Sequence, residues 1–172
     1  TVGFGFETAN SETLERMKKM ITVEDCKRAL QLCKKHNIFT MGYFVLGYPG
    51  ETYNQALKTI DFAINSPLDY AQFFAYTPLP GTETYWQAVQ KGIFGDFWAD
   101  FSKDPINHDY FPDWDEPISR KEKKTLVKHA HNKFFFNPRK MFKIYRTFNT
   151  PLRRKRLAKT AFKFLTGRFQ KF

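Results

Sequence analysis

The first 91 residues alternate short apolar runs with helix-like patterns, and this alternation restricts the fold more than any other feature. Strand-like runs occur at 2–6, 38–46 and 70–77, and apolar residues recur at helical spacing between them. Strands separated by helices imply a parallel sheet with right-handed crossovers. The central run, IFTMGYFVL, is almost continuously apolar, which is typical of a strand covered by helices. The sequence therefore predicts an α/β fold.

Local signals set the limits of the predicted helices. Asn10 or Ser11 is expected to cap the first helix, and Thr22 followed by Asp25 resembles a capping box at the start of the second. Asn37 is expected to end that second helix in the left-handed conformation. These polar residues predict where the chain changes direction around the sheet.

The two cysteines, Cys26 and Cys33, lie seven residues apart in the second helical pattern. That spacing corresponds to roughly 10 Å along a helix, too far for a disulfide. We favour two small buried apolar side chains, with a metal pair as the alternative. Without a disulfide framework, and with no apolar run of the roughly 18 to 20 residues that a spanning helix needs, the expected location is the cytoplasm.

Charge divides the chain. The 172 residues carry a net charge of +11, but residues 118–172 hold 18 Lys and Arg and one acid, so the first 117 residues are mildly acidic. We predict three parts: 1–91 with the strands, 92–117 as an irregular aromatic-rich connection, and 118–172 as a basic helical extension. The extension is expected to form helices at about 119–136, 138–148 and 151–165.

Each predicted strand ends in a turn with residues that shape ligand sites. The turns are ETAN at 7–10, GYPGET at 47–52 and TPLPGT at 77–82. Carboxyl ends of parallel strands share one edge, where ligands of such folds bind. Glycine lets a ligand approach the backbone, and proline fixes the loop. Glu51 suits a helix start and Thr52 can cap it. Ordinary turn chemistry explains each turn singly; together they predict one site.

The motif order resembles the second half of the radical S-adenosylmethionine (SAM) catalytic domain, especially the subset with an upstream cobalamin-binding domain. The likeness covers residues 1–91 and rests on G-F-E, L-x-x-M-x-K, GYFVLGYPGET and TPLPGT. It implies a partial TIM-type (β/α) barrel with parallel strands, here the fourth to sixth, followed by a helical C-terminal extension.

The same resemblance implies a set of cofactor-binding residues. Glu7 would contact the ribose or methionine part of SAM, and residues 43–47 would line its adenine. Gly50 and Glu51 would shape the loop beyond, and residues 77–81 would close the pocket. The implied residues are Glu7, Tyr43, Val45, Gly47, Pro49, Gly50, Glu51, Thr77 and Pro78. No catalytic residue and no metal ligand is implied within this chain.

One departure from the family is large. Its cluster motif, C-x-x-x-C-x-x-C, is absent, as is its Gly-Gly-Glu motif, so no [4Fe–4S] cluster can be held in the usual way. We therefore interpret the chain as a C-terminal fragment of a radical SAM enzyme, inactive without its missing N-terminal half; a degenerate paralogue is the alternative. SAM and the cluster are expected in the full-length protein, with cobalamin bound by an upstream domain. The parent reaction would be a methylation, cyclisation or rearrangement.

The basic extension is open to several interpretations. It can cap the truncated barrel, which we favour, or lie on an anionic membrane, bind an acidic protein or, least favoured, bind nucleic acid. The alternative function is therefore a non-catalytic module that docks on a membrane or acidic partner. Lipids and tetrapyrroles are the substrate classes that the family suggests. His129 and His131 are expected at the surface, and the open sheet edge predicts a dimer unless helices cover it.

Overall fold

The computed structural model of the chain describes residues 1–105 and 112–147. The chain divides into two compact units, Thr1–Phe134 and Phe135–Phe172. The first unit contains the sheet, and the second contains helix α7 (Pro138–Thr147). The helix expected at 151–165 lies outside the described residues, and the boundaries expected near 91 and 117 stay predictions.

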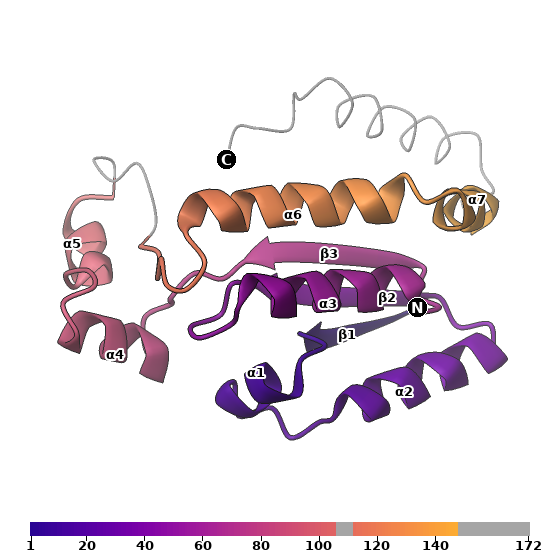
Figure 1. Cartoon of the computed structure of the whole chain (residues 1–172), viewed down its shortest axis with the longest axis horizontal. Coiled ribbons are helices and arrows are strands. Elements are labelled where there is room, and N and C mark those ends of the chain that lie inside the picture. The colour runs from indigo at the N-terminus through magenta and orange to yellow at the C-terminus, as the bar shows by residue number, and fades with distance from the viewer. Residues whose placement is uncertain (106–111, 148–172) are drawn as a thin grey trace. The chain divides into compact units, whose positions relative to one another are not determined.

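A three-stranded parallel sheet forms the centre of the first unit. Strands β1 (Val2–Glu7), β2 (Thr40–Leu46) and β3 (Tyr70–Ala75) lie in sequence order, and β2 pairs with both neighbours (Figure 1). This confirms the predicted α/β class with parallel strands. The barrel of which this sheet would be an arc stays a prediction, and α6 (Arg120–Phe135) follows the sheet in the chain.

Aromatic rings fill the layer between the sheet and its helices. Phe44 stands at the middle of β2, fully buried, with ring centroids 5.3 Å from Phe73 and 5.8 Å from Phe6. Phe62 of α3 (Tyr53–Asn65) meets both Phe6 and Phe44 edge-on at 6.3 Å. Such contacts add to the apolar area that each ring removes from water. The core therefore fixes α3 on one face of the sheet.

The capping signals of the first two helices are confirmed. The side chain of Asn10 accepts from the backbone of α1 (Ser11–Arg16), and Thr22 and Asp25 form a capping box on α2 (Val23–Lys35). Asn37 is left-handed, with φ 52°. Cys26 and Cys33 are buried free thiols, as the favoured interpretation expected. Within residues 1–105 and 112–147, no three or more His, Cys, Asp or Glu are grouped so that they could hold a metal ion.

The connection after β3 is more regular than the sequence predicted. After α4 (Glu83–Gln90), residues Phe97–Lys103 form a helix, α5, inside the stretch expected to be irregular. Asp96 caps it by accepting a hydrogen bond from the backbone N–H of Ala99. The sequence prediction missed this helix, although the rings of Phe97, Trp98 and Phe101 are at helical spacing and pack on one another.

His131 also corrects the sequence prediction. Whereas His129 is exposed, His131 is only partly exposed and lies on α6, next to β3 (Figure 1). Its Nε2 accepts a hydrogen bond from the backbone N–H of Phe73 at 3.3 Å. Burial lowers the pKa of the imidazole, which favours the neutral acceptor form. The outer edge of β3 is thus covered by α6 at this point.

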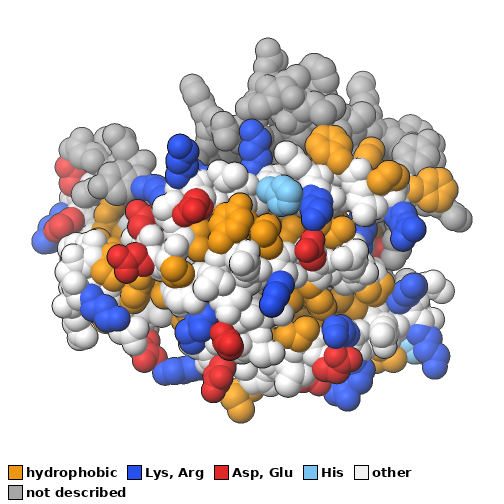
Figure 2. Space-filling model, viewed as in Figure 1, with side chains coloured by type: hydrophobic (Ala, Val, Ile, Leu, Met, Phe, Trp, Pro, Cys, Tyr) orange, Lys and Arg blue, Asp and Glu red, His pale blue; other side chains and the backbone are white. Residues whose placement is uncertain are grey.

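The face of the molecule seen in Figure 2 carries both signs of charge. Figure 2 shows Lys and Arg side chains scattered among Asp and Glu, with hydrophobic groups between them. None of the helices in the described ranges is both long and apolar enough to span a membrane.

Candidate functional site

The carboxyl ends of the three strands open onto a cleft of about 570 Å³. This volume lies in the usual range for small-molecule sites, roughly 300 to 1,000 Å³. Helices α4 and α5 lie beyond these strand ends (Figure 1). The cleft walls come from the ends of the strands, the turn after α1 and the start of α4.

The cleft brings together residues of all three predicted turns. Glu7, Val45, Pro49 and Thr77 line it, each among the residues that the sequence resemblance implied. Five other implied residues lie outside its lining, and their roles toward a ligand stay predictions: Tyr43, Gly47, Gly50, Glu51 and Pro78. The convergence of the three turns on one rim follows from the parallel sheet.

Glu7 is the carboxylate at the end of β1, and its backbone is left-handed with φ 62°. Its Oε1 lies 3.1 Å from Nζ of Lys19, and its side chain is 24% exposed. A Cβ added at Gly5 would lie 2.8 Å from that same oxygen. The glycine of the G-F-E motif therefore leaves room for the carboxylate, which the lysine neutralises in part.

Sequence reasoning missed a group of charged residues that also line the cleft. Arg16 ends α1, Lys18 and Lys19 follow it, and Glu83 comes from α4. Lys18 Nζ and Glu83 Oε2 form an ion pair at 2.5 Å that joins these two elements. The L-x-x-M-x-K motif contains Lys19, but the sequence does not show that Lys18 meets Glu83 of α4 at the cleft. The cleft therefore offers both cations and carboxylates to a ligand.

Two tyrosines supply an aromatic wall that was also missed. The rings of Tyr48 and Tyr76 meet edge-to-face with centroids 4.9 Å apart, and both side chains line the cleft. The Tyr76 hydroxyl is 2.6 Å from Oγ1 of Thr84. Burial raises the pKa of both phenols, so they stay neutral at physiological pH. Tyr48 lies inside the turn predicted at 47–52. Its aromatic side chain in that turn is the sequence feature that could have indicated a ligand-facing ring.

Glu51 turns away from the cleft and ties two of the turns together. Its side chain is fully buried, and its Oε2 accepts from the N–H of Gly47 at 2.6 Å. Its Oε1 accepts from the Thr8 hydroxyl at 3.2 Å, and that hydroxyl is 2.9 Å from Thr59 Oγ1. Burial raises the pKa of the Glu51 carboxyl, and these hydrogen bonds oppose the rise. The residue fixes the shape of the rim.

Comparison with known proteins assigns the family. The model of the radical SAM superfamily matches residues 1–63. Residues 1–63 of the chain therefore belong to the radical SAM superfamily. Residues of the radical SAM match contribute Glu7, Val45, Tyr48 and Pro49 to the cleft.

Curated relatives of this radical SAM chain are enzymes by name. An uncharacterized methyltransferase of Pyrococcus horikoshii is 32% identical over 146 residues, which are 83% of this chain and 30% of the relative. The anaerobic magnesium-protoporphyrin IX monomethyl ester cyclase of Rubrivivax gelatinosus is 30% identical over 99% of this chain and 29% of its own length. This chain thus spans less than a third of either relative.

A solved structure is also similar. The archaeal Elp3 of Methanocaldococcus infernus aligns with a TM-score of 0.47 and 24% identity, covering 54% of this chain and 22% of that one.

The cysteines do not fit the iron–sulfur cluster that the superfamily implies. A [4Fe–4S] cluster takes four ligands, usually thiolates, whereas this sequence has only Cys26 and Cys33. Both are buried on α2, and burial raises the pKa of the Cys26 thiol, which disfavours the thiolate. No step of the chemistry is therefore assigned to a cluster held by these residues.

Proposed function

We propose that the cleft holds the nucleoside part of SAM and that the chain is the C-terminal part of a radical SAM enzyme. The observation that carries the proposal is the single cleft formed by Glu7, Val45 and Thr77 at the ends of three parallel strands, within a chain of this superfamily. When bound, SAM supplies the adenosyl group and the sulfonium centre.

The side chains of the cleft suit the parts of this molecule. Glu7 can accept hydrogen bonds from the ribose hydroxyls, and the ion pair with Lys19 orients its carboxylate. Val45 and the Tyr48–Tyr76 pair offer apolar and aromatic surface to adenine. Arg16 is the cation that can pair with the methionyl carboxylate, since Lys18 is already engaged by Glu83.

The iron–sulfur cluster and the cobalamin would be bound by parts of the full-length protein outside this chain. The cluster ligands would come from an N-terminal half that carries the three-cysteine motif, so the 172-residue chain should not cleave SAM by itself. An upstream cobalamin domain fits the subset that the motifs resemble. The relative named as a protoporphyrin ester cyclase supports a tetrapyrrole as the substrate class, with a lipid as the alternative.

Binding of S-adenosylhomocysteine tests the nucleoside site directly. Amide spectra of the ¹⁵N-labelled chain, titrated with this compound to millimolar concentration, should shift at Glu7, Val45 and Thr77. Affinity should be weak, because the chain supplies one side of the cradle. Glu7→Gln should weaken the shifts, whereas Glu24→Gln, at an exposed position on α2, should not. Saturable shifts confined to other surfaces, or no shifts at all, would refute the site.

We propose as a second candidate property that α7 docks on anionic membranes. Around its start, Phe136, Met141 and Phe142 are 53%, 51% and 62% exposed, and the helix sequence PRKMFKIYRT has four cations and no acid. Exposed apolar groups beside cations suit a lipid interface better than a nucleic acid.

Vesicle sedimentation tests this docking. The chain should sediment with vesicles of equal phosphatidylcholine and phosphatidylglycerol but not with pure phosphatidylcholine, and the double variant Met141→Ser with Phe142→Ser should sediment less. Equal sedimentation of the variant and the unchanged chain would contradict lipid insertion.

A further inference from the structure

Lys123 is a buried lysine on the first turn of α6. Its side chain is 0% exposed, although lysine is among the residues least often fully buried. A cation at this end of a helix also faces the positive pole of the helix dipole. Neither solvation of the ammonium group nor the helix dipole stabilises a lysine at this position. The contacts of its side chain must therefore stabilise it.

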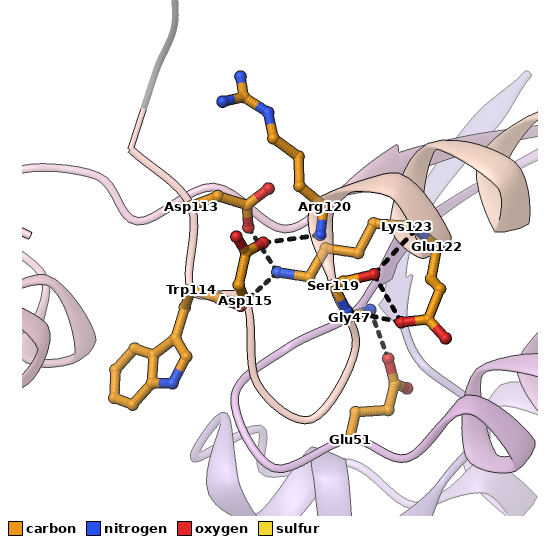
Figure 3. A network of polar contacts seen from close by, with 9 residues as sticks. All are labelled: Gly47, Glu51, Asp113, Trp114, Asp115, Ser119, Arg120, Glu122 and Lys123. Atoms are coloured by element: carbon orange, nitrogen blue, oxygen red, sulfur yellow. Dashed lines mark hydrogen bonds and ion pairs between the residues drawn. The ribbon is translucent and has the colours of Figure 1, made fainter. Parts of the chain in front are cut away.

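The ammonium group of Lys123 joins α6 to the segment before it. Nζ donates to Asp113 Oδ1 at 2.5 Å and to the backbone oxygen of Trp114 at 2.6 Å (Figure 3). The Asp113 side chain is itself only 13% exposed. Hydrogen bonds between charged groups are the strong ones, and these hold the lysine head in one place.

The methylene stem of Lys123 lies against Gly47 in the turn after β2. Gly47 has φ +80°, and a Cβ there would lie 2.6 to 2.7 Å from the Cε, Cδ and Cγ atoms of Lys123. The N–H of Gly47 donates to the buried carboxylate of Glu51 (Figure 3). The glycine is therefore held between a lysine stem and a carboxylate.

These contacts reach the cleft without entering it. Gly47 lies in the chain between Val45 and the pair Tyr48 and Pro49, all of which line the cleft. Glu51 in turn accepts a hydrogen bond from the hydroxyl of Thr8, which is next to Glu7 in the chain. None of the described residues from 112 to 134 lines the cleft.

We propose that Lys123 is a positioning residue that clamps the turn after β2 in the shape that binds the nucleoside. Helix α6 then sets the affinity of a site that its described residues up to 134 do not line. The proposal rests on the proposed function for its ligand, but the clamp itself is a property of the turn. If loss of the clamp lets the turn leave its binding-competent shape most of the time, the apparent dissociation constant rises in proportion.

Lys123→Met tests the clamp, because methionine keeps most of the stem and removes the ammonium group. We expect hydrogen exchange at the amides of residues 47–51 to accelerate while exchange in α2 stays unchanged. The dissociation constant for S-adenosylhomocysteine should rise by roughly tenfold, the effect expected from losing a buried charged hydrogen bond. Lys124→Met is the matched control, since Lys124 is the exposed neighbour on the same helix and should change neither measurement.

The two measurements separate the two proposals. If the unchanged chain binds no S-adenosylhomocysteine, the proposed function fails, and exchange at 47–51 still decides about the clamp. Exchange at 47–51 in Lys123→Met equal to that of the unchanged chain overturns the clamp. If Lys123→Met does not fold, Asp113→Asn decides in its place: it keeps the lysine, weakens the bond to its head, and should accelerate the same amides to a smaller extent.

Discussion

The turns after β2 and β3 border the same cleft but are built differently. The β2 turn is fixed from behind, because Gly47 is buried between Lys123 and Glu51. In the β3 turn, by contrast, Leu79 is 53% exposed, and a Cβ added at Gly81 would meet nothing within 4 Å. One wall is thus preorganised by distant parts of the chain, and the other depends mainly on local bonds and can adjust to a ligand.

The largest expected effect comes from a matched pair of glycine substitutions. Gly47 and Gly81 have nearly equal φ values, +80° and +81°, so alanine is strained by a similar amount at both. Gly81→Ala should lower the free energy of unfolding by about 1 kcal/mol, from the left-handed backbone alone. Gly47→Ala should lower it by about 3 kcal/mol, because its methyl group also collides with Lys123. Urea unfolding measures both; equal losses would break the comparison.

Glu51→Ala should have the next largest effect. It removes the acceptor of the Gly47 N–H, whereas the Thr8 hydroxyl keeps Thr59 as a partner, and leaving the buried N–H unpaired should lower the free energy of unfolding by about 2 kcal/mol. Glu83→Ala is the control on the β3 side, where the carboxylate is mostly exposed, and its urea midpoint should not move. A Glu51→Ala chain as stable as the unchanged one would show that the β2 turn needs no anchor.

The pH dependence of α6 docking sharpens the comparison further. Burial lowers the pKa of His131 in the folded chain, so the unfolded chain takes up the proton first. The contribution of His131 to stability is therefore complete above the unfolded pKa of about 6.5 and is lost as pH falls toward the folded pKa. Urea midpoints measured from pH 7.5 to 5 should fall more steeply for the unchanged chain than for His131→Gln. Parallel curves would exclude this titration.

The smallest expected effect lies in the β3 turn. Trp98 Nε1 donates to the backbone oxygen of Pro78 at 3.2 Å, and Trp98→Phe removes this bond. The free energy of unfolding should fall by roughly 1 kcal/mol or less. Amide exchange should increase near Thr77 but stay unchanged at 47–51; a change at 47–51 would mean that the two turns are coupled.

Local signals made much of the fold predictable. Asn10, Thr22 and Asn37 act on backbone groups within a few residues, so a short window of sequence contains the whole interaction. The alternation of strands and helices then implied the parallel sheet and the convergence of Glu7, Val45 and Thr77.

Features that depend on contacts between residues far apart in the chain were not predictable from such local signals. The sequence placed Glu51 at a helix start, but its partners Thr8 and Gly47 come from two different turns. His131 faces a strand edge 58 residues earlier in the chain, which no helical period reveals. These features depend on which surfaces the completed fold brings together.

The reach of Lys123 has a practical consequence for dissecting the protein. The family match ends at residue 63, and β3 completes the sheet soon after, so either point looks like a natural place to shorten the chain. A version that stops between β3 and α6 would keep the whole sheet yet leave Gly47 without the surface that shapes it. If such a shortened chain failed to bind the ligand, the cause would be the loss of Lys123 packing against Gly47, and not the absence of the residues that recognise the ligand.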